Sequence, residues 1–343
     1  MRGTERLALV VGLVVALCGA AHAVNIDWVT VGDAGNQADT RSEPGYWGMG
    51  DVGNEYRIGK YEITNAQYRE FLSAKAAVGD PYGLYNTDMA GTYGGISRSG
   101  SGTVGDPYVY SAKGGDANWD SRPVVYVSFW DAARFANWMH NGQGSGDTES
   151  GAYINIGDQA TFARQLGAAF FIPTEDEWYK AAYYKGGGLD AGYWEYPTQS
   201  MLIPTCEAPP GTDMVNGSVN HHYGGGEVGA PYYSTAVGAY TAMPSTSAYG
   251  TFDQGGTVWE WNEAAIGLSR GIRGGTWDSD IWQPVILSAY WRGWARPSTE
   301  ARGYGFRLAS SMADPDPVIP EPATLSLFGI AVAAMLRRRT RRA

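Results

Sequence analysis

Two carboxylates flank a glycine-bearing turn in the stretch DQGGTVWE, with Asp253 at its start and Glu260 at its end. Calcium binds six to eight oxygens from carboxylates and backbone carbonyls, so this spacing fits a calcium site to which carbonyls between the two residues also contribute. The alternative is structural, because Glu260 stands between Trp259 and Trp261 and would face outward on a strand that buries both rings.

Aromatic and charged side chains gather in a second stretch, from Gly274 to Arg307. Exposed rings beside carboxylates and guanidinium groups can stack on sugars or peptides and hydrogen-bond to them. Most tryptophans serve the core, and we expect about two of the four here to be accessible and Arg307 to be structural. The candidate ligand-binding residues are Trp277, Asp278, Asp280, Trp282, Trp291, Arg292 and Trp294.

Three helices are predicted by one N-terminal pattern, a hydroxyl residue followed three positions later by an acidic or amide residue. The pairs are Thr64 with Gln67, Ser128 with Asp131, and Thr174 with Glu177, after β-prone runs at 56–63, 124–127 and 170–172. The acidic run 175–177 resembles paired carboxylates for hydrolysis. Because a helix dipole favours acidic side chains at its N-terminus, we interpret this run as a helix start.

Irregular structure is predicted between these helices. The glycine-, tyrosine- and serine-rich stretches 79–116 and 141–151 have the composition of long loops. With 48 glycines and 17 prolines, the chain is unlike a helical bundle or a doubly wound sheet. Its 13 tryptophans and 23 tyrosines supply the apolar area that such a chain needs.

The first 23 residues form a predicted signal peptide, with two early arginines, an apolar run at 7–17 and Ala-His-Ala at 21–23. The mature chain should therefore begin near Val24. Leu17, not a small residue, precedes Cys18, which argues against lipidation there. Cys206 is then the remaining thiol, and one thiol cannot form an intramolecular disulfide.

The other end, residues 313–343, contains Pro-Glu-Pro-Ala at 320–323, a short apolar run at 325–336 and five arginines. The run is shorter than the roughly 17 to 25 residues of a comfortable bilayer span. An ordinary C-terminal anchor is the alternative. The order of the three parts resembles the PEP-CTERM sorting signal, which implies recognition by an exosortase, cleavage near Pro-Glu-Pro, transient membrane contact and release to the outer surface.

The charge of the chain excludes one class of partner. It carries 25 basic and 35 acidic residues, a net charge of −10. Because a surface of this sign repels phosphate backbones, we expect no nucleic-acid binding.

Six blocks resemble, in order, the signatures of the formylglycine-generating enzyme family, also called sulfatase-modifying factor: TNAQYREFL, RPVVYVSFWDAARFANWM, IPTEDEWYKAA, GTFDQGGTVWEW, RGIRGGTW and GYGFRLA. The resemblance implies one domain over residues 24–312 with an α+β, C-type-lectin-like fold, little regular secondary structure and bound calcium. It assigns one calcium to the side chains of Asp253 and Glu260 and the carbonyls of Gly256 and Val258. The Asn220 side chain and the His221 carbonyl would begin a second calcium site.

The resemblance does not extend to the family's oxidase chemistry. Oxidases of the family bind copper through two cysteines five positions apart, and soft thiolates suit Cu(I). Those positions fall on Ser279 and Pro284, so we expect neither copper nor formylglycine formation. Sulfoxide-forming relatives hold iron on a histidine cluster from a helical domain, whereas the histidines after the signal peptide are His140, His221 and His222.

The sequence therefore predicts an exported cell-surface protein that binds a glycan or peptide without catalysis and uses calcium structurally. Two alternatives remain: a divergent protein-modifying oxidase, and a structural component of the extracellular matrix.

Overall fold

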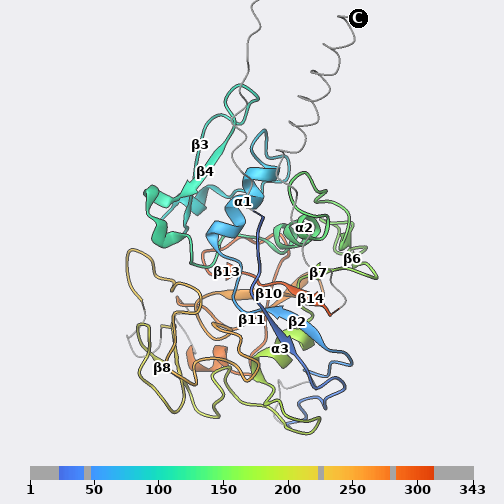
Figure 1. The fold of residues 1–343 in the computed structure, drawn as a ribbon, viewed down its shortest axis with the longest axis vertical. Helices are drawn as coiled ribbons and strands as arrows, with labels where there is room; N and C mark the ends of the chain where they lie inside the picture. The colour runs from blue at the N-terminus through green and yellow to red at the C-terminus, as the bar shows by residue number, and fades with distance from the viewer. Residues whose placement is uncertain (1–22, 42–47, 223–227, 279–282, 313–343) are drawn as a thin grey trace, which may run out of the picture. The chain divides into compact units, whose positions relative to one another are not determined.

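The computed structural model describes residues 23–41, 48–222, 228–278 and 283–312 (Figure 1). Its helices are α1 (Asn65–Lys75), α2 (Phe129–His140) and α3 (Glu175–Tyr183). All three begin at the predicted positions, and each has the reciprocal pair of hydrogen bonds that defines a capping box. Within the described residues, no helix is long and apolar enough to cross a membrane.

Two four-stranded sheets form the centre of the fold. The first has the order β1-β2-β14-β7 and is antiparallel throughout. The second has the order β12-β11-β10-β13, and β13 runs parallel to β10. Their strands are β1 (Trp28–Val31), β2 (Tyr56–Gly59), β7 (Phe170–Phe171), β14 (Ala309–Ser311), β10 (Trp259–Ile266), β11 (Ser269–Arg273), β12 (Gly293–Ala295) and β13 (Tyr304–Gly305).

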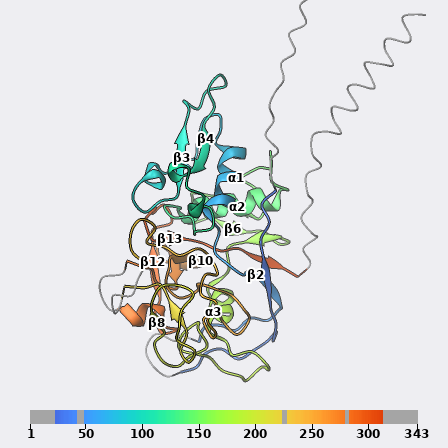
Figure 2. The same ribbon diagram turned by 60° about the vertical axis from the view of Figure 1, so that its left-hand side comes forward.

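Short elements fill much of the remaining described chain. The strand pairs are β3 (Ile96–Ser99) with β4 (Val109–Ala112), β5 (Tyr153–Ile154) with β6 (Ala163–Arg164), and β8 (Thr205–Cys206) with β9 (Ser218–Val219). The 3-10 helices are η1 (Thr87–Ala90), η2 (Lys113–Gly115), η3 (Ala117–Trp119) and η4 (Gln283–Leu287). Figures 1 and 2 show the β3–β4 hairpin beside α1, at one end of the body.

Two local expectations were wrong. The stretch 79–116 is not a plain loop, because it contains the β3–β4 hairpin and η1. The run 124–127 does not form a strand. Tyr126 has φ of 61°, a left-handed conformation that breaks extended structure, and Pro123 makes a single bridge to Thr64.

The largest core cluster joins α1 and α2 to the first sheet. On α2 the face formed by Phe129, Ala132, Ala133 and Ala136 is fully buried, as the spacing of a core-facing helix requires. A second cluster surrounds α3 and consists mostly of rings: Trp178, Tyr179, Tyr183, Tyr184 and Tyr193. The molecule is thus the loop-rich α+β fold that the sequence predicts, and α3 brings Trp178 against the second sheet.

Candidate functional site

A buried ion pair lies where the two sheets meet. Arg307 donates from Nε to Glu260 Oε2 at 2.6 Å and from Nη2 to Glu260 Oε1 at 2.7 Å. Its other donors reach the carbonyls of Gly59 and Phe252, both at 2.9 Å. Glu260 Oε2 also accepts the Trp178 indole N–H at 2.7 Å. Arg307 is therefore structural, as expected, and Glu260 faces inward.

The strand pairings explain this placement. Glu260 on β10 pairs in parallel with Gly305 on β13, so Arg307 follows two residues further along the chain. Gly305 packs so closely that a Cβ there would lie 2.8 Å from the Val124 carbonyl oxygen. Beyond Arg307 the chain joins β2, since Gly59 donates its N–H to the Leu308 carbonyl.

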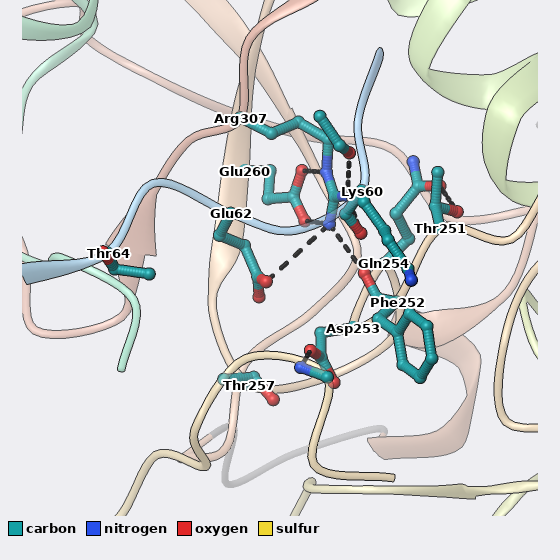
Figure 3. Close-up of polar contacts among 12 residues, drawn as sticks. Lys60, Glu62, Thr64, Thr251, Phe252, Asp253, Gln254, Thr257, Glu260 and Arg307 are labelled. Carbon is teal, nitrogen blue, oxygen red and sulfur yellow. Dashed lines mark hydrogen bonds and ion pairs between the residues drawn. The ribbon is translucent and has the colours of Figure 1, made fainter. Parts of the chain in front are cut away.

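Two further carboxylates lie at this ion pair (Figure 3). Glu62 is 3.9 Å from Arg307, and Figure 3 shows the Glu62 carboxylate linked to the guanidinium and Asp253 on the adjacent turn. Asp253 Oδ2 accepts the Gly238 N–H at 2.6 Å. Both Glu62 oxygens are buried and accept no hydrogen bond from the described residues. Glu62 is 1 % exposed, Asp253 7 %, and Glu260 and Arg307 0 %.

Burial dominates the electrostatics of these two carboxyls. Loss of water, reinforced by the nearby Asp253 carboxylate, raises the pKa of Glu62 well above its usual value, although Arg307 opposes the shift. Burial raises the pKa of Asp253 to about 6, against the Gly238 N–H and Arg307, which both lower it. Burial therefore favours the protonated, neutral form of Glu62, and Arg307 is left to pair with Glu260.

The turn between Asp253 and Glu260, which holds the first predicted calcium site, contacts the segment of the second predicted site at Asn220. Gly256 has φ of 84°, and a Cβ there would lie 2.3 Å from the Asn220 carbonyl oxygen. Thr257 donates its N–H to that same oxygen at 2.9 Å. The Asn220 side chain is used within its own loop, since Nδ2 reaches the Tyr233 carbonyl and Oδ1 accepts the Val228 N–H.

Calcium fits part of the predicted donor set. Asp253 offers a buried carboxylate, but both Glu260 oxygens already accept from Arg307. The His221 carbonyl accepts from the Cys206 thiol. Val258 is fully buried. No cluster of three or more His, Cys, Asp or Glu side chains suitable for a metal occurs within the described ranges. An ion here would therefore combine few carboxylates with neutral oxygens, which is compatible with calcium.

A group of aromatic rings surrounds Trp277, beside the segment where the family resemblance puts its thiols. Tyr93 and Tyr233 lie 5.0 Å apart, and their ring centroids are 5.2 and 5.1 Å from that of Trp277. The Arg302 guanidinium lies over Tyr93 and Trp277 and forms an ion pair with Asp278. Trp277 itself is buried, whereas Tyr93 and Tyr233 are partly exposed and Arg302 is half-exposed, so this aromatic cluster presents the cation and parts of the two tyrosines to solvent.

Other candidate ligand-binding residues are more dispersed. Arg292 pairs with Glu175 at the start of α3, as does the fully buried Arg273. Trp291 is half-buried, whereas Trp294 on β12 is 60 % exposed. Pro284 lies in η4, and Ser279, Asp280 and Trp282 lie outside the described residues.

Sequence reasoning missed Glu62, Tyr93, Tyr233 and Arg302. One signal was available for Glu62, an acidic residue inside the β-prone run that leads into α1. No spacing pattern indicates that Tyr93 and Tyr233 meet Trp277, because loops bring them together. The acidic run at the start of α3 is structural: Glu175 pairs with the two arginines, and Glu177 caps the helix.

Comparison with known families agrees with the blocks noted in the sequence. A family model described as "Sulfatase-modifying factor enzyme 1-like domain" matches residues 36–312. The chain belongs to this family. A second model, the PEP-CTERM protein-sorting motif, matches residues 318–342 of the same sulfatase-modifying-factor-like protein. This motif implies export to the cell envelope or surface and recognition by an exosortase.

Curated and solved relatives are distant. The hercynine oxygenase of Mycolicibacterium smegmatis is 25 % identical over 286 residues, covering 74 % of this chain and 52 % of the oxygenase, so the chain spans about half of that relative. Treponema denticola variable protein 1 is 17 % identical, with 85 % of this chain and 97 % of that chain covered and a TM-score of 0.48. PvdO from Pseudomonas aeruginosa is 16 % identical, with 83 % and 94 % covered and a TM-score of 0.47.

Proposed function

We propose that this exported protein binds a glycan or a peptide, without catalysis, on the aromatic cluster of Tyr93, Tyr233 and Trp277 with Arg302 and Asp278. One observation carries the proposal: rings, a guanidinium and a carboxylate converge at Trp277 and Asp278, which directly precede in sequence the first position where the family resemblance puts a thiol. Serine stands at that position, and proline stands at the second one.

The chemistry of the cluster suits a polar ligand with apolar faces. The edges of rigid aromatic rings offer contact area at little cost in conformational entropy. Arg302 adds donors and Asp278 adds acceptors near the same rings. A pyranose, or a peptide with an aromatic or acidic side chain, presents matching groups. Tyr93, Tyr233, Trp277 and Asp278 lie in loops and turns, where binding residues commonly lie.

The test is a titration of the purified protein with extracellular polysaccharide of the source bacterium and with an oligosaccharide and peptide panel, followed by tryptophan fluorescence. The variant Tyr93→Ala/Arg302→Ala should bind at least about tenfold more weakly, because it removes one ring and the exposed cation. The matched control is Tyr82→Ala, since Tyr82 also stacks under an arginine, Arg134, but elsewhere in the fold.

Equal affinity in the cluster variant and the wild type would refute this location for the site. Absence of saturable binding across the panel would refute glycan or peptide binding as the function.

A divergent oxidase is the second candidate, because a relative is named an oxygenase. It predicts conversion of a cysteine in a sulfatase-type peptide to formylglycine, or a comparable oxidation, detected by mass spectrometry under oxygen with added copper or iron. The proposal of a non-catalytic binder would be abandoned if such a product formed catalytically.

A further inference from the structure

Six large apolar side chains are exposed in loops that are hydrogen-bonded to one another. Each side chain is between 45 % and 75 % exposed. Together they form the apolar surface, which consists of Met201, Leu202, Ile203, Met214, Val215 and Met243. Single exposed apolar residues are ordinary on a soluble protein, whereas a group of them marks an interaction site.

Hydrogen bonds bring the three segments of the apolar surface together. Ser200 Oγ donates to Asn216 Oδ1 at 3.1 Å, and β8 pairs with β9 just after these residues. The Ala242 N–H donates to the Pro210 carbonyl at 3.1 Å, which ties the third segment to the same loop. Figures 1 and 2 show β8 at the end of the body opposite the β3–β4 hairpin. The six side chains therefore belong to one surface.

The loop that carries Met214 and Val215 is fixed by its own hydrogen bonds. Asp213 Oδ1 accepts the N–H groups of Val215 and Asn216, both at 2.9 Å. Asp213 Oδ2 accepts the Thr205 hydroxyl at 2.8 Å. Because polar groups hold the turn, the fold does not need apolar side chains at its tip. A surface that is ordered in advance loses little conformational entropy on binding.

The charge along this stretch of the chain is acidic. No lysine or arginine occurs between Lys185 and Arg270. Glu207 and Asp213 lie in the loop that carries the tip of the apolar surface. The Ser218 hydroxyl donates to Glu207 at 2.6 Å and holds the pKa of that carboxyl below its usual value. A complementary partner would therefore carry basic side chains.

We propose that the apolar surface docks a polypeptide segment whose apolar side chains are flanked by lysine or arginine. Three of the six side chains are methionine, which is unbranched and adapts to partners of irregular shape. A second copy of this chain fits less well, because it would bring Glu207 and Asp213 against the same carboxylates. A membrane also fits less well, because interfacial segments carry basic and aromatic side chains, and the six residues include neither.

The experiment measures the binding of two short labelled peptides to the full chain by fluorescence anisotropy. One peptide is an amphipathic pattern of leucine and lysine, and the other has glutamate in place of lysine. The Leu/Lys peptide should bind at least about tenfold more tightly than the Leu/Glu peptide. The surface variant, Leu202→Ser/Val215→Ser, should bind the Leu/Lys peptide about tenfold more weakly than wild type. Its Tm should stay within about 2 °C of wild type, because both side chains are exposed.

The matched control is Val104→Ser/Leu268→Ser, which removes two exposed apolar side chains from the β3–β4 loop and the β10–β11 turn. It should bind the Leu/Lys peptide as wild type does. The apolar surface shares no residue with the aromatic cluster, so Tyr93→Ala/Arg302→Ala should also bind this peptide normally. Wild-type affinity in the surface variant, equal affinity for the two peptides, or an equal loss in either control would overturn the proposal.

Two other occupants are tested with the same proteins. Wild-type protein should not sediment with phosphatidylcholine vesicles and should not dimerise as its concentration rises. Vesicle binding or dimerisation that the surface variant abolishes would assign the surface to a membrane or to a second copy, and would overturn the proposal. If the surface variant melts lower than expected, Leu202→Ser alone replaces it, with the same outcomes.

Discussion

Replacing Arg307 with methionine tests whether the buried ion pair holds the two sheets together. The change removes a guanidinium that is 0 % exposed and leaves the Glu260 carboxylate in the interior without its cation. Breaking a buried pair by deleting one partner costs about 3–5 kcal/mol. The carbonyls of Gly59 and Phe252 also lose a donor, so the upper part of this range is expected.

The expected change in melting temperature follows from the size of the domain. Unfolding entropy is roughly 2.1 cal/mol/K per residue, or about 0.6 kcal/mol/K for the matched family domain. A loss of about 5 kcal/mol therefore lowers Tm by about 8 °C. The assay is calorimetry in chelator, which keeps the result independent of calcium.

Two further variants sharpen the comparison. Arg302→Met removes an arginine from a half-exposed pair with Asp278, and such pairs contribute about 0–1 kcal/mol, so Tm should fall by less than about 2 °C. Adding Glu260→Gln to Arg307→Met removes the stranded charge and should recover part of the loss. If Arg307→Met and Arg302→Met lower Tm equally, the reasoning about the buried pair is wrong.

Three more predictions concern caps and backbone. Burial raises the pKa of Asp131 to about 7, so the folded state loses up to about 4 kcal/mol of stability as pH rises from about 4 to 7. The variant Asp131→Asn should show a smaller decline when the free energy of unfolding is measured in urea at about pH 4 and about pH 8. An equal fall in the free energy of unfolding between these two pH values in the wild type and the variant would contradict this prediction. Gly256→Ala should cost at least about 2 kcal/mol, because its φ is 84° and the new Cβ meets the Asn220 carbonyl. The control is Gly105→Ala, whose new Cβ meets no atom and which should change the free energy of unfolding by less than about 0.5 kcal/mol. A similar loss in both variants would rule out backbone strain at Gly256 as the cause. Thr174→Ala should destabilise by about 1 kcal/mol in the same assay, and no measurable change would show that the α3 cap is dispensable.

The features predictable from sequence are those set by neighbouring residues. Thr64, Ser128 and Thr174 each cap a helix because the partner stands three positions later, so a short window contains both halves of the interaction. The run 124–127 failed because its β-prone residues are held by tertiary contacts, with Tyr126 donating its N–H to the distant Ala301 carbonyl.

The candidate sites depend on contacts that no local pattern contains. Arg307 reaches the Gly59 carbonyl, 248 residues away, and the Tyr93 ring meets Trp277 through loops. A motif can propose that Asp253 and Glu260 share an ion, because both lie in one turn. It cannot show that Arg307 pairs with Glu260, or that Glu62, which follows β2 in the chain, lies next to Arg307.

Glu260 shows why strand alternation misled on one point. Trp259 and Trp261 flank it, and a sheet with one solvated face would turn the glutamate outward. Here β10 is an inner strand with both faces covered. Trp261 donates its indole N–H to the Val127 carbonyl beside α2, while Glu260 meets Trp178 of α3 and Arg307. An acidic residue on a doubly covered strand requires a fixed cation, which Arg307 supplies. Because that cation is then committed to Glu260, it only partly opposes the burial that raises the pKa of Glu62 and of Asp253.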